Sequence, residues 1–265
     1  MSLTFQAGLL RGKVAVVTGG GSGINFAIAK RFAEHGAKLA IIGRSQEKLD
    51  QATKQLSAHN TQAVGFSADV RDYAAVAGAI AQTREQLGPV DIVVCGAAGN
   101  FPAPADKLSA NGFKAVVDID LLGTFNTCRA AFEHLSKPGA SIINISAPQA
   151  FVPMAFQAHV CAAKAGVDMI TRTLAVEWGT HGVRVNSIVP GATAETEGMS
   201  RLATSEAVAE EIRNAIPLRR WGSKDELADL ALFLCSPAAA YINGAVITCD
   251  GGLGLMGAAA WKLNA

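Results

Sequence analysis

The chain has 265 residues, of which half are hydrophobic and 17% are charged, and its formal net charge is +1. A chain of this length and composition can bury a sizeable core, and it suits one α/β domain better than two. The near-zero net charge and the absence of long basic or acidic runs argue against binding to nucleic acid or to an anionic membrane surface.

The five cysteines are widely spaced in apolar surroundings, and the sequence has no CxxC pair or His-rich cluster. They predict reduced core residues of a cytoplasmic protein, with neither a disulfide framework nor a metal site. The N-terminal residues do not resemble a secretory signal, and Leu263-Asn264-Ala265 is not a peroxisomal tripeptide. The apolar region 230–247 is interrupted by Ser236-Pro237 and Asn243-Gly244, so we expect no membrane span.

Short β-branched runs alternate with longer amphipathic segments along the chain. The expected strands are residues 14–18, 38–43, 63–67, 92–95, 141–145, 183–188 and 245–249. The expected helices between them include residues 27–35, 46–59, 74–87 and 112–135. Continuously apolar strands separated by helices indicate a parallel sheet that is covered on both faces. Right-handed crossovers then give an α/β, Rossmann-type, doubly wound sheet of about seven strands in a single domain.

The first expected strand runs directly into a glycine-rich loop, Gly19-Gly20-Gly21-Ser22-Gly23-Ile24. A buried strand, a glycine-rich turn and a helix start are the parts of a dinucleotide site. Glycines let the backbone approach the pyrophosphate, and the helix N-terminus presents free N–H groups to it. We therefore predict cofactor contacts from Gly19, Gly21, Ser22, Gly23 and Ile24. A tight turn without a ligand is the alternative.

The second expected strand is followed by Arg44 and Ser45, with no carboxylate to hold the ribose hydroxyls of NAD. Arg44 can pair with a 2′-phosphate and Ser45 can add a hydrogen bond, so the pattern favours NADPH. An exposed arginine that caps a loop is the alternative. After the third strand, Asp69 either accepts a hydrogen bond from adenine or caps the helix that begins near Asp72.

Several short motifs together resemble the short-chain dehydrogenase/reductase family over nearly the whole chain. They are Thr18-Gly19…Gly23, Ala68-Asp69-Val70, Ala97-Ala98-Gly99, Asn186…Pro190-Gly191 and Asp250-Gly251-Gly252. The resemblance implies one domain over residues 1–265, a substrate lid over residues 194–217, and a homotetramer built on the fourth and fifth helices. It also implies further cofactor contacts from Val70, Ala97, Gly99, Lys164, Pro190, Gly191, Thr193 and Thr196.

The chain departs from the family pattern at the positions that usually carry the chemistry. The family's catalytic tyrosine falls on Val160, its serine on Ala147 and its asparagine on Asp120. No shift of frame restores the motif, because neither of the two tyrosines has a lysine four residues later. Two further departures are outside this set: the third loop glycine is Asn25, and the Asn-Asn-Ala-Gly motif reads Cys95-Gly96-Ala97-Ala98-Gly99.

One branch of the family, the peroxisomal-type 2,4-dienoyl-CoA reductases, resembles this chain at these positions. The shared segments are Ala97 to Phe101, Asp118-Ile119-Asp120, Gly123-Thr124-Phe125, Ala163-Lys164-Ala165, Leu174 to Gly179 and Thr196-Glu197-Gly198. That branch lacks the tyrosine and uses an aspartate, a lysine and a water. The resemblance therefore implies Asp120 and Lys164 as the catalytic residues and an acyl-CoA as the substrate.

The chemistry of a dienoyl thioester is compatible with the missing tyrosine. Reduction of a ketone places negative charge on one oxygen, which needs an acid at once. In a conjugated dienoyl thioester the charge spreads to the thioester oxygen as a dienolate. A lysine ammonium can stabilise that oxygen, and a water held by a carboxylate can deliver a proton to carbon.

Helical spacing supports Asp120 independently, because it lies on an inward stripe formed by Phe113, Val116, Val117, Asp120 and Thr124. Asp118 lies on another face, four residues after Lys114, where we expect a surface ion pair. A carboxylate on a buried stripe needs a partner, and Lys164 is the natural one. A purely structural Asp120–Lys164 pair is the alternative.

On the substrate side we expect Asn100, Phe101 and Ser146, which follow strands at their carboxyl edge. Ser146 either contacts substrate or caps its loop, and His159 is either a proton relay or a residue that only starts a helix. The arginines of the lid region either bind CoA phosphates or are solvated surface charges; they are Arg201, Arg213, Arg219 and Arg220.

The sequence thus predicts an NADPH-dependent reductase of 2,4-dienoyl-CoA or a similar enoyl thioester. Two alternatives stay open: a reductase of another acyl thioester, and an inactive NADP(H)-binding sensor or scaffold.

Overall fold

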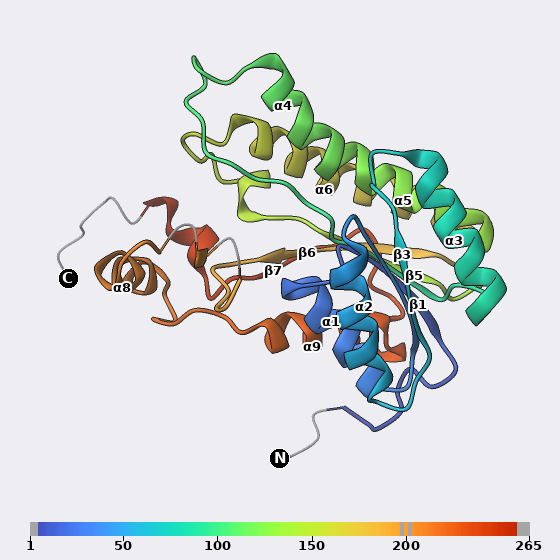
Figure 1. Cartoon of the computed structure of the whole chain (residues 1–265). Coiled ribbons are helices and arrows are strands. Elements are labelled where there is room, and N and C mark those ends of the chain that lie inside the picture. The colour runs from blue at the N-terminus through green and yellow to red at the C-terminus, as the bar shows by residue number, and fades with distance from the viewer. Residues whose placement is uncertain (1–4, 197–198, 201–202, 259–265) are drawn as a thin grey trace.

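The computed structural model describes residues 5–196, 199–200 and 203–258. Its centre is a seven-stranded sheet in the order β3-β2-β1-β4-β5-β6-β7, in which every neighbouring pair is parallel (Figure 1). The strands are β1 Val14–Thr18, β2 Lys38–Gly43, β3 Ala63–Ser67, β4 Ile92–Cys95, β5 Ser141–Ile145, β6 Arg184–Pro190 and β7 Val246–Cys249. The strand order reverses between β1 and β4, which confirms the doubly wound α/β fold.

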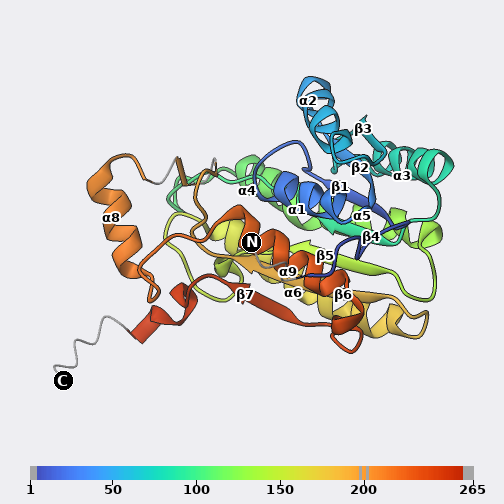
Figure 2. The same cartoon turned by 90° about the horizontal axis from the view of Figure 1, so that it is seen from below.

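Helices cover both faces of this sheet (Figures 1 and 2). One face carries α1 Gly23–Glu34, α2 Gln46–Ser57 and α9 Lys224–Cys235. The other face carries α3 Tyr73–Leu87, α5 Gly123–Ala131 and α6 Ala158–Gly179. Two further helices, α4 Ala110–Val117 and α8 Glu206–Ala215, lie beyond the carboxyl ends of the strands, and Figure 2 shows α8 set apart from the sheet.

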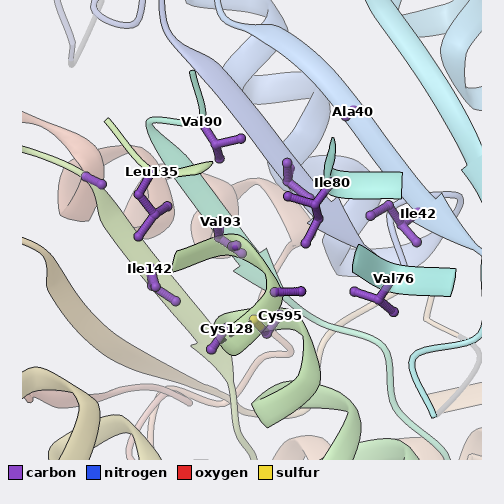
Figure 3. Packing of buried hydrophobic residues seen from close by; sticks show 14 of the residues in the cluster. Ala40, Ile42, Val76, Ile80, Val90, Val93, Cys95, Cys128, Leu135 and Ile142 are labelled. Carbon is purple, nitrogen blue, oxygen red and sulfur yellow. Dashed lines mark hydrogen bonds between the residues drawn. The ribbon is translucent and has the colours of Figure 1, made fainter. Parts of the chain in front are cut away.

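The side chains of β1 alternate between the two cores, as the pleat of a strand requires. Val14 and Val16 join the cluster beneath α3, α5 and α6, whereas Ala15 and Val17 join the cluster beneath α1, α2 and α9. Figure 3 shows the first cluster, in which Ile80 of α3 lies over the sheet. Burial on both faces explains why the strands read as continuous apolar runs.

The expected helix 112–135 is not continuous. It consists of α4, a π-helical turn Asp118–Leu122, α5 and a 3₁₀ turn Phe132–His134. At Gly123, a Cβ atom would lie 2.5 Å from Val70 Cγ2, so the start of α5 packs closely against the segment that follows β3. The π-turn absorbs one extra residue just before that contact, and π-turns of this kind are frequent at functional sites.

Smaller differences concern the ends of elements. Strand β6 runs to Pro190, two residues beyond the expected end at 188, and β7 begins at Val246, one residue later than expected. Part of the expected lid, residues 197–198 and 201–202, lies outside the described residues. In the described part of the chain, no helix is both long and apolar enough to cross a membrane.

Candidate active site

A cavity of about 580 Å³ opens where the strand order reverses, at the carboxyl ends of β1, β4 and β5. Ligands of doubly wound sheets bind at this point. Most of the residues expected from the sequence line it: Gly19, Gly21, Ser22, Gly23, Ile24, Arg44, Ser45, Asp69, Val70, Ala97, Gly99, Asn100, Asp120, Ser146, Lys164, Pro190 and Thr196. Segments from all parts of the chain therefore meet at one site.

The glycine-rich loop has the features that a pyrophosphate requires. Ser22 is the N-cap of α1, its side chain makes no capping hydrogen bond, and the first turn has no acidic residue. The first N–H groups of α1 therefore keep their capacity to bind an anion. Gly23 has φ +61°, and a Cβ atom there would project into open space. These residues fit the phosphates of a dinucleotide.

At the nucleotide end of the cavity, Arg44 lines the wall and no carboxylate stands at the end of β2. Ser45 also lines the wall, but its hydroxyl caps α2 by accepting a hydrogen bond from Lys48 N at 3.4 Å. The side chain of Arg44 is exposed and free to approach a ribose phosphate from solvent. An exposed arginine at the end of β2 can pair with an anionic group of a nucleotide.

Asp69 lines the same cavity but is not a helix cap. Its carboxylate accepts hydrogen bonds from Arg71 Nε at 3.0 Å and from Arg71 Nη2 at 2.6 Å. These bonds lower the pKa of Asp69. The cap of α3 is Asp72, which accepts from Ala75 N at 3.1 Å, so the capping alternative for Asp69 is wrong.

The centre of the cavity holds a buried ion pair between Asp120 and Lys164 (Nζ–Oδ2 3.1 Å). Their side chains are 1% and 7% exposed. Backbone groups fix both partners: Gly99 N donates to Asp120 Oδ1 at 2.7 Å, and Lys164 Nζ donates to the Ile145 carbonyl at 3.0 Å. The inward position predicted for Asp120 is confirmed, as is the surface pair of Asp118 with Lys114.

The cavity wall beside this pair is apolar where the family pattern places a tyrosine and a serine. Val160 and Ala147 line the cavity. Ser146 also lines it, and its buried hydroxyl lies beside the carboxyl of Asp168 and does not cap the loop.

Asp168 of α6 is a buried carboxyl next to Ser146, and it was not predicted from the sequence. It accepts a hydrogen bond from Ser187 Oγ at 3.0 Å. Burial raises its pKa, and the nearby Ser146 and Ser187 hydroxyls and the charges of Arg172 and Lys164 oppose that rise. Its position four residues after Lys164 was the available signal, because it places both on one face of α6.

Three expected site residues do not line the cavity. Gly191 packs on Asp250, and Thr193 Oγ1 donates to the Gly191 carbonyl at 3.0 Å. The ring of Phe101 packs against that of His159 in a tilted arrangement, with centroids 4.6 Å apart. His159 is fully buried and also lies outside the cavity lining, so the relay role finds no geometric support. Thr196, which does line it, donates to the Thr193 carbonyl at 2.8 Å.

The described arginines in and just after the lid region have protein partners. Arg213 pairs with Glu206, Arg220 with Glu226 at 2.6 Å, and Arg219 donates to the Asn214 carbonyl. These contacts favour surface charges over CoA ligands. Arg201 lies outside the described residues.

The family model for enoyl-(acyl carrier protein) reductases matches residues 19–254. The fold, the glycine-rich loop and this match together show that the chain belongs to the short-chain dehydrogenase/reductase family.

Its relatives include the peroxisomal 2,4-dienoyl-CoA reductases [(3E)-enoyl-CoA-producing] of Arabidopsis thaliana and Rattus norvegicus. The first is 44% identical over 96% of this chain and 89% of the relative, and the second is 45% identical over 94% and 86%. Among solved structures, a short chain dehydrogenase from Bacillus anthracis superposes with a TM-score of 0.83 at 39% identity, covering 92% of this chain and 97% of that one.

Proposed function

We propose that this protein is an NADPH-dependent reductase of 2,4-dienoyl-CoA thioesters and that it yields a 3-enoyl thioester. The observation that carries the proposal is the buried Asp120–Lys164 pair, which lines a cofactor-sized cavity beside Val160 and Ala147. A site built only for ketones needs an acid next to the carbonyl oxygen, and the positions that the family pattern gives to the tyrosine and the serine carry Val160 and Ala147 here. The names of the relatives support the substrate class and the product.

NADPH, held by the loop Gly19–Ile24 and by Arg44, would supply the hydride, which would add to C5 of the dienoyl chain and leave the dienolate. Lys164 keeps its ammonium beside the cavity because Asp120 and the Ile145 carbonyl hold it there. That ammonium stabilises the negative thioester oxygen of the dienolate. Ser146 lines the same cavity, and its hydroxyl would donate a second hydrogen bond to that oxygen by turning away from Asp168.

Asp120 positions the proton donor. Its Oδ1 accepts from Gly99 N–H, so Oδ2, which pairs with Lys164 Nζ, is the oxygen that would accept from a water admitted beside the pair during the reaction. The water transfers one proton to C2 of the dienolate, the C2–H bond forms, and the resulting hydroxide takes a proton from bulk water. The double bond then lies between C3 and C4.

The substrate class is tested by mixing the protein with NADPH and a panel of compounds and following the cofactor absorbance. We expect oxidation with 2,4-dienoyl-CoA and none with simple ketones. Oxidation with ketones alone would overturn the proposal, and NADPH binding without turnover of any thioester would indicate an inactive sensor or scaffold.

We also propose that the protein assembles as a homotetramer. Large apolar side chains are exposed on the outer surface of the π-turn, α5 and α6: Leu122, Phe125, Met169 and Val176, the last 79% exposed. Such a patch on one face typically marks a protein interface. Size-exclusion chromatography with light scattering tests this state.

The lid role of residues 194–217 and the cytoplasmic location remain predictions.

A further inference from the structure

Two departures from the family pattern that are 71 residues apart in sequence meet in space at the edge of the cavity. Asn25, in the first turn of α1, donates from Nδ2 to the carbonyl of Gly96 at 2.7 Å. Both residues line the cavity. Gly96 follows β4 directly, so the contact joins the start of α1 to the end of the neighbouring strand.

The contact requires glycine at position 96. A Cβ atom on Gly96 would lie 2.1 Å from Asn25 Oδ1, 2.3 Å from Cγ and 2.5 Å from Nδ2. All three are atoms of the carboxamide, and its hydrogen bond to the Gly96 carbonyl keeps it in place. The asparagine therefore occupies the volume that a side chain at position 96 would take.

The same contact fixes the backbone at Gly96, which leads to the Gly99 N–H that binds Asp120. The N–H of Gly96 donates to Thr18 Oγ1 of β1 at 3.1 Å, and its carbonyl accepts from Asn25 of α1. Both backbone groups of Gly96 are therefore held by hydrogen bonds. Three residues later, Gly99 N donates to the carboxylate of Asp120. A displacement of Gly96 would thus move one wall of the cofactor cavity and the backbone donor of the catalytic carboxylate.

We propose that Asn25 and Gly96 form a compensated pair, in which the Asn25 carboxamide replaces a side chain at position 96 and clamps β4 to the cofactor loop. Asn25 is thereby a positioning residue for the dinucleotide. The inference rests on the proposed function for the identity of the cofactor but not for the substrate.

The test is a double-mutant cycle with Asn25→Ala, Gly96→Ala and the double variant, read out as the dissociation constant of NADPH by fluorescence titration. Loss of the clamp in Asn25→Ala should raise the constant about 5–10-fold, as expected for one hydrogen bond. Gly96→Ala should raise it by more than about 10-fold, because the methyl group and the carboxamide cannot both fit. In the Asn25→Ala background, Gly96→Ala should raise the dissociation constant less than about 2-fold, because the Asn25 carboxamide no longer fills that space.

Gly78→Ala is the matched control, because Gly78 is an exposed glycine of α3 whose added Cβ would meet no atom within 4 Å. It should leave NADPH binding unchanged. If Gly96→Ala does not fold, recovery of a cooperative urea transition in the double variant supports the pair, and failure to recover it overturns the pair. Wild-type binding by Gly96→Ala, or equal effects of that change in both backgrounds, would also overturn it. If the double-mutant cycle gives the expected NADPH affinities but the protein does not turn over dienoyl-CoA, only the proposed function is contradicted.

Discussion

The buried ion pair of the site gives a stability prediction that separates charge from packing. Lys164→Met keeps the length of the side chain and removes its charge, which leaves the carboxylate of Asp120 with Gly99 N–H as its one remaining hydrogen-bond donor among the described residues. Asp120→Asn keeps an acceptor for Gly99 but turns the ammonium of Lys164 into an unpaired buried charge. Each change therefore leaves the remaining charged side chain without its counter-ion, at a position where that side chain is at most 7% exposed.

Removing one member of a buried pair costs about 3–5 kcal/mol. Because this pair lines a cavity that water can enter, we expect each single variant to lose about 3 kcal/mol of unfolding free energy, at the low end of that range. The double variant Asp120→Asn/Lys164→Met removes both charges of the pair. Its loss should be smaller than the sum of the two single losses by about 1–3 kcal/mol.

Urea unfolding followed by circular dichroism measures these differences, and a loss of about 3 kcal/mol corresponds to a fall in Tm of about 6–12 °C in a chain of this size. Asp118→Asn is the control, since Asp118 lies on the same π-turn and pairs with Lys114 at the surface. Exposed pairs contribute about 0–1 kcal/mol. Strictly additive losses, or a loss no larger than that of Asp118→Asn, would refute the reasoning.

Three further predictions concern single side chains. Arg44→Ala should weaken NADPH about 10–100-fold in fluorescence titrations, as for a charged hydrogen bond, and NADH by less than about 2-fold; equal losses would show that Arg44 does not read the 2′-phosphate. Arg220 lowers the pKa of Glu226 from 4.5 to about 2, so the stabilisation is complete above pH 4.5 and is lost as the pH falls through 2. Because this pair is exposed and Glu226 also caps α9, Glu226→Gln should cost about 1 kcal/mol at pH 6 and almost nothing at pH 2 in urea titrations; a cost independent of pH would contradict this. Burial raises the pKa of Asp168 above 3.8, so ionisation destabilises the fold as the pH rises through that range, and the advantage of wild type over Asp168→Asn should shrink between pH 4 and pH 7. An advantage that grows with pH would contradict the direction of this shift.

The strands were predictable because burial on both faces of the sheet gives each strand a continuous run of apolar residues, which can be read from the local sequence. Five of the seven, including Val14–Thr18 and Ile92–Cys95, have the bounds expected from their apolar runs. The π-turn Asp118–Leu122 was not predictable from local spacing; it lies beside a close contact between Gly123 and Val70, which are far apart in sequence. The same spacing rules nevertheless separated the surface Asp118 from the buried Asp120.

The sequence identified the polar residues of the site better than their partners. Asp120 and Lys164 could be paired from helical spacing and family resemblance, but the Gly99 N–H and the Ile145 carbonyl that hold them are backbone groups without a residue-type signal. Asp69 was ambiguous because two aspartates precede α3, and the cap belongs to the one whose carboxylate reaches Ala75 N. Phe101 was expected at the cavity from its place after β4, but the ring turns toward His159.

Turnover of 2,4-dienoyl-CoA by Asp120→Asn, measured on folded protein saturated with NADPH, addresses the chemistry of the site most directly. We expect a kcat reduced by about 10²-fold or more, with NADPH affinity near that of wild type and full activity in Asp118→Asn. A kcat for Asp120→Asn within a few-fold of wild type would show that the aspartate and the amine beside it only hold the fold together.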